Sequence, residues 1–321
     1  MPQDLYIKEK LSDRKPRKSY RFPLFLAIGL GIIATILALI FNQPKSNDVE
    51  PAQTTATSQL GVDAENAAAT PPKAGKPAKE TPAAPPHRDI LGLLRQSEDL
   101  ADADKLVEAR EQLLRVLKVS DNAVVLNKAR GMLNSINTKL LLTPRSMPGK
   151  QEYMVKSGDT LDKIAKKFGI TVSLIQKSND IRGHLIHPGQ RLRIPSSDFS
   201  IRVDKSENTL TVKYNGQYFK SYKVGTGKYE KTPTGKSKVT DRIAQPTWWR
   251  PDGKPIPYGS PDNLLGTHWL ALDIPGYGIH GTWEPETIGK YESAGCIRML
   301  NENIEELYTI IPLGTPVTIE E

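Results

Sequence analysis

The hydrophobic and polar positions of the chain change their spacing several times along its 321 residues, so we expect several structural parts. The first clear pattern is an apolar run without any charged side chain over residues 22–41. A helix rises about 1.5 Å per residue, and a helix of this length crosses a hydrocarbon core of about 30 Å. The run therefore predicts a single transmembrane helix. We interpret it as an uncleaved anchor because it is longer than the apolar core of a cleaved signal peptide, the alternative for such a run.

Residues 1–21 carry seven basic and three acidic side chains, so half of the chain's net charge of +8 lies before the apolar run. Basic residues that flank a membrane span stay on the cytoplasmic side. We therefore expect a cytoplasmic N-terminus and a single-pass cell-membrane protein, whose later domains lie in the periplasm or cell envelope. The basic tail is interpreted as a topology signal, and binding to nucleic acid is not expected.

Residues 42–87 are rich in proline, alanine, threonine and lysine and contain almost no large apolar side chains. Such a segment cannot bury enough surface to offset the entropy of ordering. It predicts a disordered linker, which would let the later parts of the chain work away from the membrane.

Residues 88–143 show a helical spacing of apolar side chains, as in Leu106, Ala109 and Leu113. A break at residues 120–122 offers an aspartate or an asparagine as the cap of a second helix. The pattern predicts a helical hairpin that resembles one tetratricopeptide unit. A spacer or a packing element for the next domain is favoured over a docking site for a protein partner.

Residues 151–196 alternate between short strand patterns and short helix patterns. A strand begins at Tyr153, Asp159 or Thr160 caps a helix, and a second helix and a second strand follow. The pattern predicts a small β-α-α-β module.

This module resembles a LysM domain, which is marked by Gly-Asp-Thr-Leu at 158–161, Asn-x-Ile at 179–181 and Pro-Gly-Gln at 188–190. LysM domains bind glycans that contain N-acetylglucosamine in a shallow groove between two loops. The resemblance implies peptidoglycan as a partner. By position, it assigns the glycan to Gly158, Asp159, Thr160, Asn179 and Ile181, although turns and helix caps are the structural alternatives for these residues.

Residues 199–321 are rich in strand patterns. Asn215 and Gly216 tolerate positive φ and join two such strands, which is the strongest short signal for a β-hairpin. Further strands are expected at 270–274, 278–280 and 317–319, with one helix at 301–311. The pattern predicts a mainly-β domain with a flanking helix.

The candidate chemistry of this domain lies around Cys296, the one cysteine of the chain. A single cysteine excludes an internal disulfide and any multi-cysteine metal site. His280 lies 16 residues upstream and can deprotonate the thiol, while Gly295 leaves room for a substrate carbonyl. Arg298 can lower the pKa of the thiol or hold a substrate carboxylate. From these residues alone, a catalytic thiol and a buried structural cysteine are about equally supported.

The two segments resemble the YkuD-type L,D-transpeptidase family, which is marked by His-Gly-Thr at 280–282 and Ser-x-Gly-Cys-x-Arg at 293–298. The resemblance implies a catalytic domain over residues 199–321 and an acyltransferase that uses neither a metal nor an organic cofactor. The implied site residues are Cys296 as the nucleophile, His280 as general base and acid in an ion pair with the thiolate, Gly295 in the oxyanion region, and Ser293 and Arg298 in support.

The family's reaction is acyl transfer on stem tetrapeptides of peptidoglycan. Cys296 would form a thioester with the third residue, and an amine of a neighbouring stem would complete a 3→3 cross-link. Water in its place gives an L,D-carboxypeptidase, and a lysine of an envelope protein gives protein attachment. A non-catalytic peptidoglycan-binding scaffold is the alternative from a different class. Ala294 replaces the second histidine of many members, which weakens a two-histidine mechanism.

Several other residues have a more ordinary prediction. We expect His268 to be structural or to line the substrate path. We expect Trp248, Trp249 and Trp283 to pack in the core, with substrate contact as the alternative for Trp283, which neighbours the His280 segment. The group that orients His280 stays open between three alternatives: Asp273, Ser293 and a backbone carbonyl.

Overall fold

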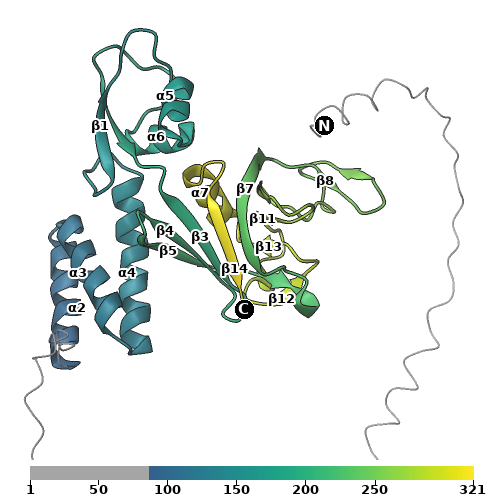
Figure 1. Cartoon of the computed structure of the whole chain (residues 1–321), viewed down its shortest axis with the longest axis horizontal. Coiled ribbons are helices and arrows are strands. Elements are labelled where there is room, and N and C mark those ends of the chain that lie inside the picture. Colours follow the sequence, from purple (N-terminus) through teal and green to yellow (C-terminus); the bar gives the residue numbers. More distant parts are fainter. Residues whose placement is uncertain (1–86) are drawn as a thin grey trace, which may run out of the picture. The chain divides into compact units, whose positions relative to one another are not determined.

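The computed structural model describes residues 87–321 (Figure 1). The predicted basic tail and transmembrane helix, and the predicted linker up to residue 86, lie outside the described residues. Every helix within residues 87–321 is too short or too polar to span a bilayer.

Three helices form the first part of the described chain: α2 (His87–Asp102), α3 (Leu106–Val119) and α4 (Ala123–Leu141). The prediction of a two-helix hairpin was therefore wrong in its helix count. The additional break lies at Asp104, which has a φ of +59°. Its carboxylate contacts Lys139 at 3.2 Å and Arg145 at 2.7 Å. The break is thus supported by contacts distant in the sequence, and neither glycine nor proline marks it. The predicted cap between α3 and α4 is confirmed, because Asn122 Oδ1 accepts the backbone N–H groups of Val124 and Val125.

A β-α-α-β module follows, as predicted. Strands β1 (Lys150–Met154) and β2 (Arg191–Pro195) pair antiparallel, and between them lie α5 (Leu161–Phe168) and α6 (Val172–Ser178). Leu161, Ile164, Leu174, Ile175 and Leu192 are almost fully buried and form its core. Thr160 is the cap of α5, since its Oγ1 accepts the backbone N–H of Lys163 at 3.2 Å.

The last part of the chain is built on one eight-stranded sheet. Its strands, in spatial order, are β13 (Ile297–Arg298), β11 (Gly278–His280), β10 (His268–Leu272), β7 (Gly235–Ala244), β14 (Pro316–Glu320), β3 (Phe199–Asp204), β4 (Thr209–Tyr214) and β5 (Gln217–Lys223). Helix α7 (Asn301–Ile310) packs against β10 and β11. The mainly-β prediction with one flanking helix is confirmed.

The predicted hairpin between β4 and β5 is also confirmed. Asn215 and Gly216 have φ angles of +50° and +71°, the left-handed values that a tight two-residue turn requires. Two short strand pairs complete the domain: β6 (Thr226–Gly227) pairs with β12 (Tyr291–Ser293), and β8 (Trp248–Trp249) pairs with β9 (Pro255–Ile256).

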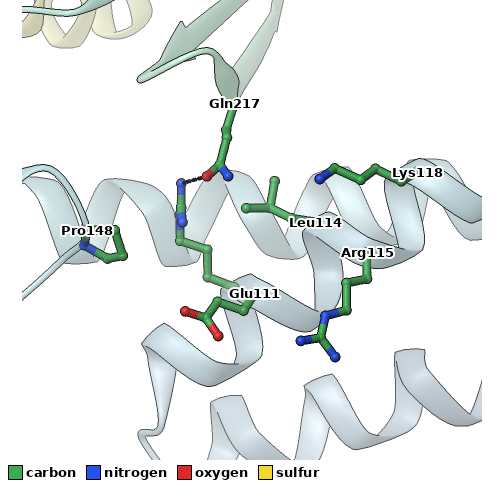
Figure 2. A pocket seen from close by; sticks show the side chains of 7 residues that line it. Glu111, Leu114, Arg115, Lys118, Pro148 and Gln217 are labelled. Carbon is green, nitrogen blue, oxygen red and sulfur yellow. Dashed lines mark hydrogen bonds between the residues drawn. The ribbon is translucent and has the colours of Figure 1, made fainter.

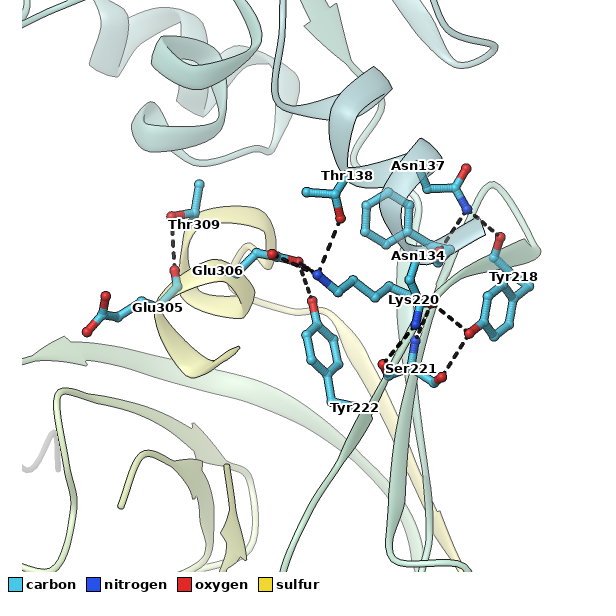
Figure 3. A network of polar contacts seen from close by, with 11 residues as sticks. Asn134, Asn137, Thr138, Tyr218, Lys220, Ser221, Tyr222, Glu305, Glu306 and Thr309 are labelled. Carbon is cyan, nitrogen blue, oxygen red and sulfur yellow. Dashed lines mark hydrogen bonds and ion pairs between the residues drawn. The ribbon is translucent and has the colours of Figure 1, made fainter. Parts of the chain in front are cut away.

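Helix α4 covers the edge strand β5 of this sheet (Figure 3). The Asn137 side chain donates to the backbone carbonyl of Phe219 at 2.7 Å, and Asn134 Oδ1 accepts the backbone N–H of Ser221 at 3.2 Å. Lys220 on the same strand forms an ion pair with Glu306 of α7 at 2.7 Å. The helical part is thus a packing element, which satisfies backbone groups that an open sheet edge would leave without partners.

Candidate active site

The candidate catalytic segments meet at one end of the eight-stranded sheet, where β11 and β13 run parallel. In this register His280 lies opposite Arg298, and Ile279 lies opposite Ile297. Both isoleucines are buried, so the alternating side chains of His280 and Arg298 project to the other face of the strands. Cys296 directly precedes β13. The pairing therefore brings the thiol and the imidazole, which are 16 residues apart in sequence, into one small region.

His280 is buried, with 3% of its surface exposed, and its Nδ1 lies 2.6 Å from the carbonyl oxygen of Gly281. A carbonyl only accepts, so Nδ1 carries the proton and Nε2 keeps a lone pair. The backbone carbonyl is thus the group that orients His280. Asp273 is used elsewhere, because it accepts the hydroxyl of Ser237 at 2.5 Å. Trp269 stacks on the imidazole at 5.7 Å between ring centroids.

Burial controls the protonation of both candidate residues. It lowers the pKa of His280 to about 4, against the opposing effect of the Gly281 carbonyl and with a smaller lowering by the Arg298 charge. Burial also raises the pKa of the Cys296 thiol, although the Gly278 backbone N–H and Arg298 act in the other direction. The neutral forms of the Cys296 thiol and of the His280 imidazole are therefore favoured at rest. The thiolate–imidazolium pair that the family resemblance implied is not favoured at rest.

Ser293 holds the backbone around the thiol. Its Oγ accepts the N–H of Gly295 at 3.1 Å and donates to the carbonyl of Cys296 at 2.6 Å. The Gly295 N–H thus already has an acceptor, and the assignment of Gly295 to the oxyanion region stays a prediction. The backbone N–H of Cys296 has no hydrogen-bond acceptor among residues 87–321. The thiol itself donates to the Gly276 carbonyl at 3.6 Å.

The reason for glycine at position 295 also differs from our expectation. Gly295 has a φ of +134°, and a Cβ there would lie 2.7 Å from Cε1 of Tyr277 and 3.1 Å from the carbonyl oxygen of Lys231. The space beside the backbone is thus filled by the protein and not left for a substrate carbonyl.

Arg298 lies beside the site with its guanidinium largely buried. Its Nη1 donates to Glu284 at 3.1 Å, and its Nε is buried without a partner in the described part of the chain. Glu284 was not identified from the sequence, because nothing local marks an acidic residue 14 positions away as a partner. The role of Arg298 toward a substrate carboxylate stays a prediction.

In the β-α-α-β module, most of the predicted glycan-binding side chains are already used internally. Asp159 accepts the hydroxyl of Tyr153 at 2.7 Å, and Thr160 caps α5. Asn179 donates to the carbonyl of Arg193 at 2.9 Å and accepts its N–H at 2.6 Å. Gly158 has open space beside it, and Ile181 is partly buried against the core. For the three polar residues, a structural role is thus sufficient to explain the side chain.

The predictions for His268 and for the three tryptophans have different outcomes. His268 lies on β10, where it packs against Tyr308 at 4.4 Å between ring centroids, as a structural residue would. The core prediction was wrong for Trp249 and Trp283, which are 59% and 48% exposed. Trp248 is half-buried on β8.

A cavity of about 280 Å³ is lined by none of the candidate catalytic residues. Figure 2 shows the side chains that line it. Its lining consists of Arg110, Glu111, Leu114, Arg115, Lys118, Pro148 and Gln217, which come from α3, the β4–β5 hairpin and the segment before β1. Residues 87–321 contain no cluster of histidine, cysteine and acidic side chains suited to a metal ion.

Comparisons with known proteins match two parts of the chain. The family model of the YkuD L,D-transpeptidase catalytic domain matches residues 198–319, and the LysM domain model matches residues 153–195. "Putative L,D-transpeptidase YkuD" of Bacillus subtilis is 37% identical over 174 residues, which cover 52% of this chain and 97% of that protein. "Probable L,D-transpeptidase YcfS" of Escherichia coli is 27% identical and covers 53% of this chain and 62% of that protein. The NMR structure of the catalytic domain of the E. faecium L,D-transpeptidase is 29% identical, covers 39% of this chain and 98% of that chain, and has a TM-score of 0.32.

Proposed function

Because the chain belongs to the YkuD family of L,D-transpeptidases, we propose that it cross-links the stem peptides of peptidoglycan through a thioester on Cys296. The observation that carries this proposal is the parallel pairing of β11 with β13, which puts His280 beside the segment that begins with Cys296. Cys296 supplies a nucleophile and His280 a base with a free Nε2, which are the two groups that acyl transfer through sulfur requires.

In the first half-reaction, Cys296 attacks the carbonyl carbon of the third residue of a donor tetrapeptide. His280 takes the thiol proton as the bond to sulfur forms, which fits two groups that are neutral at rest. The carbon–nitrogen bond to the terminal D-alanine then breaks, and His280 returns the proton to the departing amine. The backbone N–H of Cys296 donates to the oxyanion of the tetrahedral intermediate.

In the second half-reaction, the side-chain amine of the third residue of a neighbouring stem attacks the thioester. The new amide bond forms, the carbon–sulfur bond breaks, and the thiol regains its proton through His280. The product is a 3→3 cross-link. With water as the acceptor, the same steps would give an L,D-carboxypeptidase, and a lysine of an envelope protein would give attachment of that protein.

The other parts of the chain supply location in this proposal. The LysM module, which the structure ties to the catalytic domain through a hydrogen bond from Thr171 to the Thr309 carbonyl at 2.5 Å, would hold the enzyme on glycan strands. The apolar run at residues 22–41 would anchor it in the cell membrane, with the catalytic domain in the periplasm or cell envelope.

The test uses the full chain in detergent with disaccharide-tetrapeptides, and mass spectrometry follows the products. We expect release of D-alanine together with cross-linked dimers, and we expect the Cys296→Ala variant to form neither. Tripeptide without dimers would make the enzyme a carboxypeptidase. If the wild type forms no product although a thiol titration finds Cys296 intact, the non-catalytic scaffold is favoured.

A further inference from the structure

We propose that Thr232 is a positioning residue, which aims the backbone N–H of Cys296 at the oxyanion of acyl transfer. This inference rests on the proposed function, because it concerns the same site and reaction. Thr232 lies 64 residues before the nucleophile and belongs to neither of the two segments that carry the candidate chemistry.

Thr232 is buried, with 1% of its surface exposed, and its hydroxyl is fixed by two hydrogen bonds. The Oγ1 accepts the backbone N–H of Gly227 at 2.8 Å and donates to the carbonyl of Gly295 at 2.8 Å. A hydroxyl has one proton to donate, and here the Gly295 carbonyl receives it. The direction of that carbonyl is therefore set from outside its own loop.

The Gly295 carbonyl and the Cys296 N–H belong to the same peptide unit. A trans peptide is rigid and planar, so its C=O and N–H point in opposite directions. When Thr232 holds the carbonyl, it also fixes the N–H on the opposite side. Ser293 holds the remaining polar backbone groups of the two residues, which leaves the Cys296 N–H as the donor without an acceptor within residues 87–321.

The strand that carries this support lies against the cysteine loop without any side chain between them. Gly227 of β6 pairs with Ser293 of β12, and a Cβ on Gly227 would lie 2.9 Å from the Cα of Gly295 and 2.8 Å from the N of Thr232. The two backbones are thus packed too closely to admit a side chain at position 227, which leaves the Gly295–Cys296 peptide little freedom to rotate. The β6 strand and Thr232 thus form a rigid support for the donor.

An oxyanion donor must be present and also correctly oriented, because its N–H has to point at the charge that develops in the transition state. Loss of one donor lowers the rate of acyl transfer by about 10² to 10³. A peptide that is free to rotate keeps part of this effect. We therefore expect loss of the Thr232 hydroxyl to lower the rate by roughly 10 to 10².

The test compares Thr232→Val, which has the same shape without the hydroxyl, with Thr232→Ser, which keeps it. Two reactions of the full chain are measured: release of D-alanine from a tetrapeptide, and alkylation of Cys296 by iodoacetamide. Alkylation is displacement at a saturated carbon, so it uses the same thiol but develops no oxyanion. We expect Thr232→Val to lower the rate of D-alanine release and to leave the rate of alkylation within about twofold of the wild type. We expect Thr232→Ser to keep both rates.

If Thr232→Val slows both reactions equally, Thr232 only holds the cysteine in place and the inference is overturned. Unchanged D-alanine release by Thr232→Val would also overturn it. If the Thr232→Val variant fails to fold, judged by circular dichroism, Thr232→Ala takes its place. If the wild type releases no D-alanine but is alkylated, the proposed function fails separately. Acylation by p-nitrophenyl acetate, which does form an oxyanion, then replaces the tetrapeptide reaction in the same comparison.

Discussion

The Nδ1 atom of His280 lies 2.6 Å from the carbonyl oxygen of Gly281, and this contact keeps the proton on that nitrogen. The imidazole acts as a base only while Nε2 is unprotonated. Since burial lowers the pKa of His280 to about 4, we expect kcat/KM for release of D-alanine to stay level from neutral pH down to about pH 5. The rate should fall only as the pH passes through about 4, and a pH profile of the purified full chain checks this.

His268 supplies the control for this profile, because burial also lowers its pKa but it packs against Tyr308 away from the thiol. We expect His268→Gln to keep the same acid limb and His280→Gln to lose most activity at every pH. An acid limb near pH 6.5, the ordinary value for histidine, would contradict the burial argument.

The same buried imidazole makes the stability of the domain depend on pH. The pKa of His280 is lower in the fold than in the unfolded chain, so the unfolded chain binds the proton more readily. Its contribution to stability is therefore complete above about pH 6.5 and is lost as the pH falls from about 6.5 toward 4. We expect a loss of about 2 kcal/mol between pH 7 and pH 5 from this group.

All 4 tryptophans of the chain, at positions 248, 249, 269 and 283, belong to the catalytic domain, so tryptophan fluorescence reports its unfolding specifically. The measurement compares urea unfolding of the wild type and His280→Phe at the two pH values. A similar pH dependence in both proteins would show that other groups, and not His280, are responsible.

Local signals in the sequence were sufficient for much of the fold. The Asn215-Gly216 turn, the Asn122 cap and the β-α-α-β spacing each depend on residues close together in the chain, and the structure confirms all three. The long strand β7 (Gly235–Ala244) was missed, because only two of its ten residues are buried and it lacks a clear alternation. The break at Asp104 was missed because its partners lie 35 and 41 residues further along.

Local signals in the sequence likewise indicate one part of the candidate site and not the other. Cys296 and His280 stand in motifs that the sequence displays, and a register of two strands brings them together. The support around them comes from distant residues: the Thr232 hydroxyl acts across 63 positions, and Tyr277 fills the space beside Gly295. Such contacts follow from the packing of the whole domain and not from the spacing of residues along the chain.

Asn137 is expected to be important for the stability of the catalytic domain although it belongs to α4. It donates to the Phe219 carbonyl at 2.7 Å and accepts Arg110 Nε at 2.7 Å, and both contacts are buried. Asn137→Ala leaves both groups without a partner, which costs about 2 to 3 kcal/mol. Urea unfolding followed by tryptophan fluorescence measures the change. Asn127→Ala, at an exposed position of the same helix, is the matched control and should stay within about 0.5 kcal/mol of the wild type.

Asn179 is expected to act on the fold of the LysM module and not directly on a glycan. Its side chain makes three hydrogen bonds to the backbone of Ile175 and Arg193, at distances between 2.6 and 2.9 Å. We expect Asn179→Ala to speed amide hydrogen exchange throughout the module, and to weaken binding to chitin oligomers only as far as the folded fraction falls. Weaker binding with unchanged exchange would instead support direct contact with the glycan.

Gly295 is expected to tolerate no side chain, because two independent costs meet there. The first is its φ of +134°, a conformation that residues with a Cβ rarely adopt, and the second is the approach of 2.7 Å to Tyr277. We expect Gly295→Ala to lower release of D-alanine by at least about 10², since accommodating the added Cβ displaces the Cys296 peptide from its support.

Gly289→Ala separates the two costs of a side chain, because Gly289 has a φ of +83° with open space beside it. This control should lose about 1 to 2 kcal/mol of stability while keeping activity. Adding Tyr277→Ala to the Gly295 variant removes the closer contact, so partial recovery of activity is expected. No recovery would assign the whole effect to backbone strain and to the Lys231 carbonyl, which stays 3.1 Å from the added Cβ.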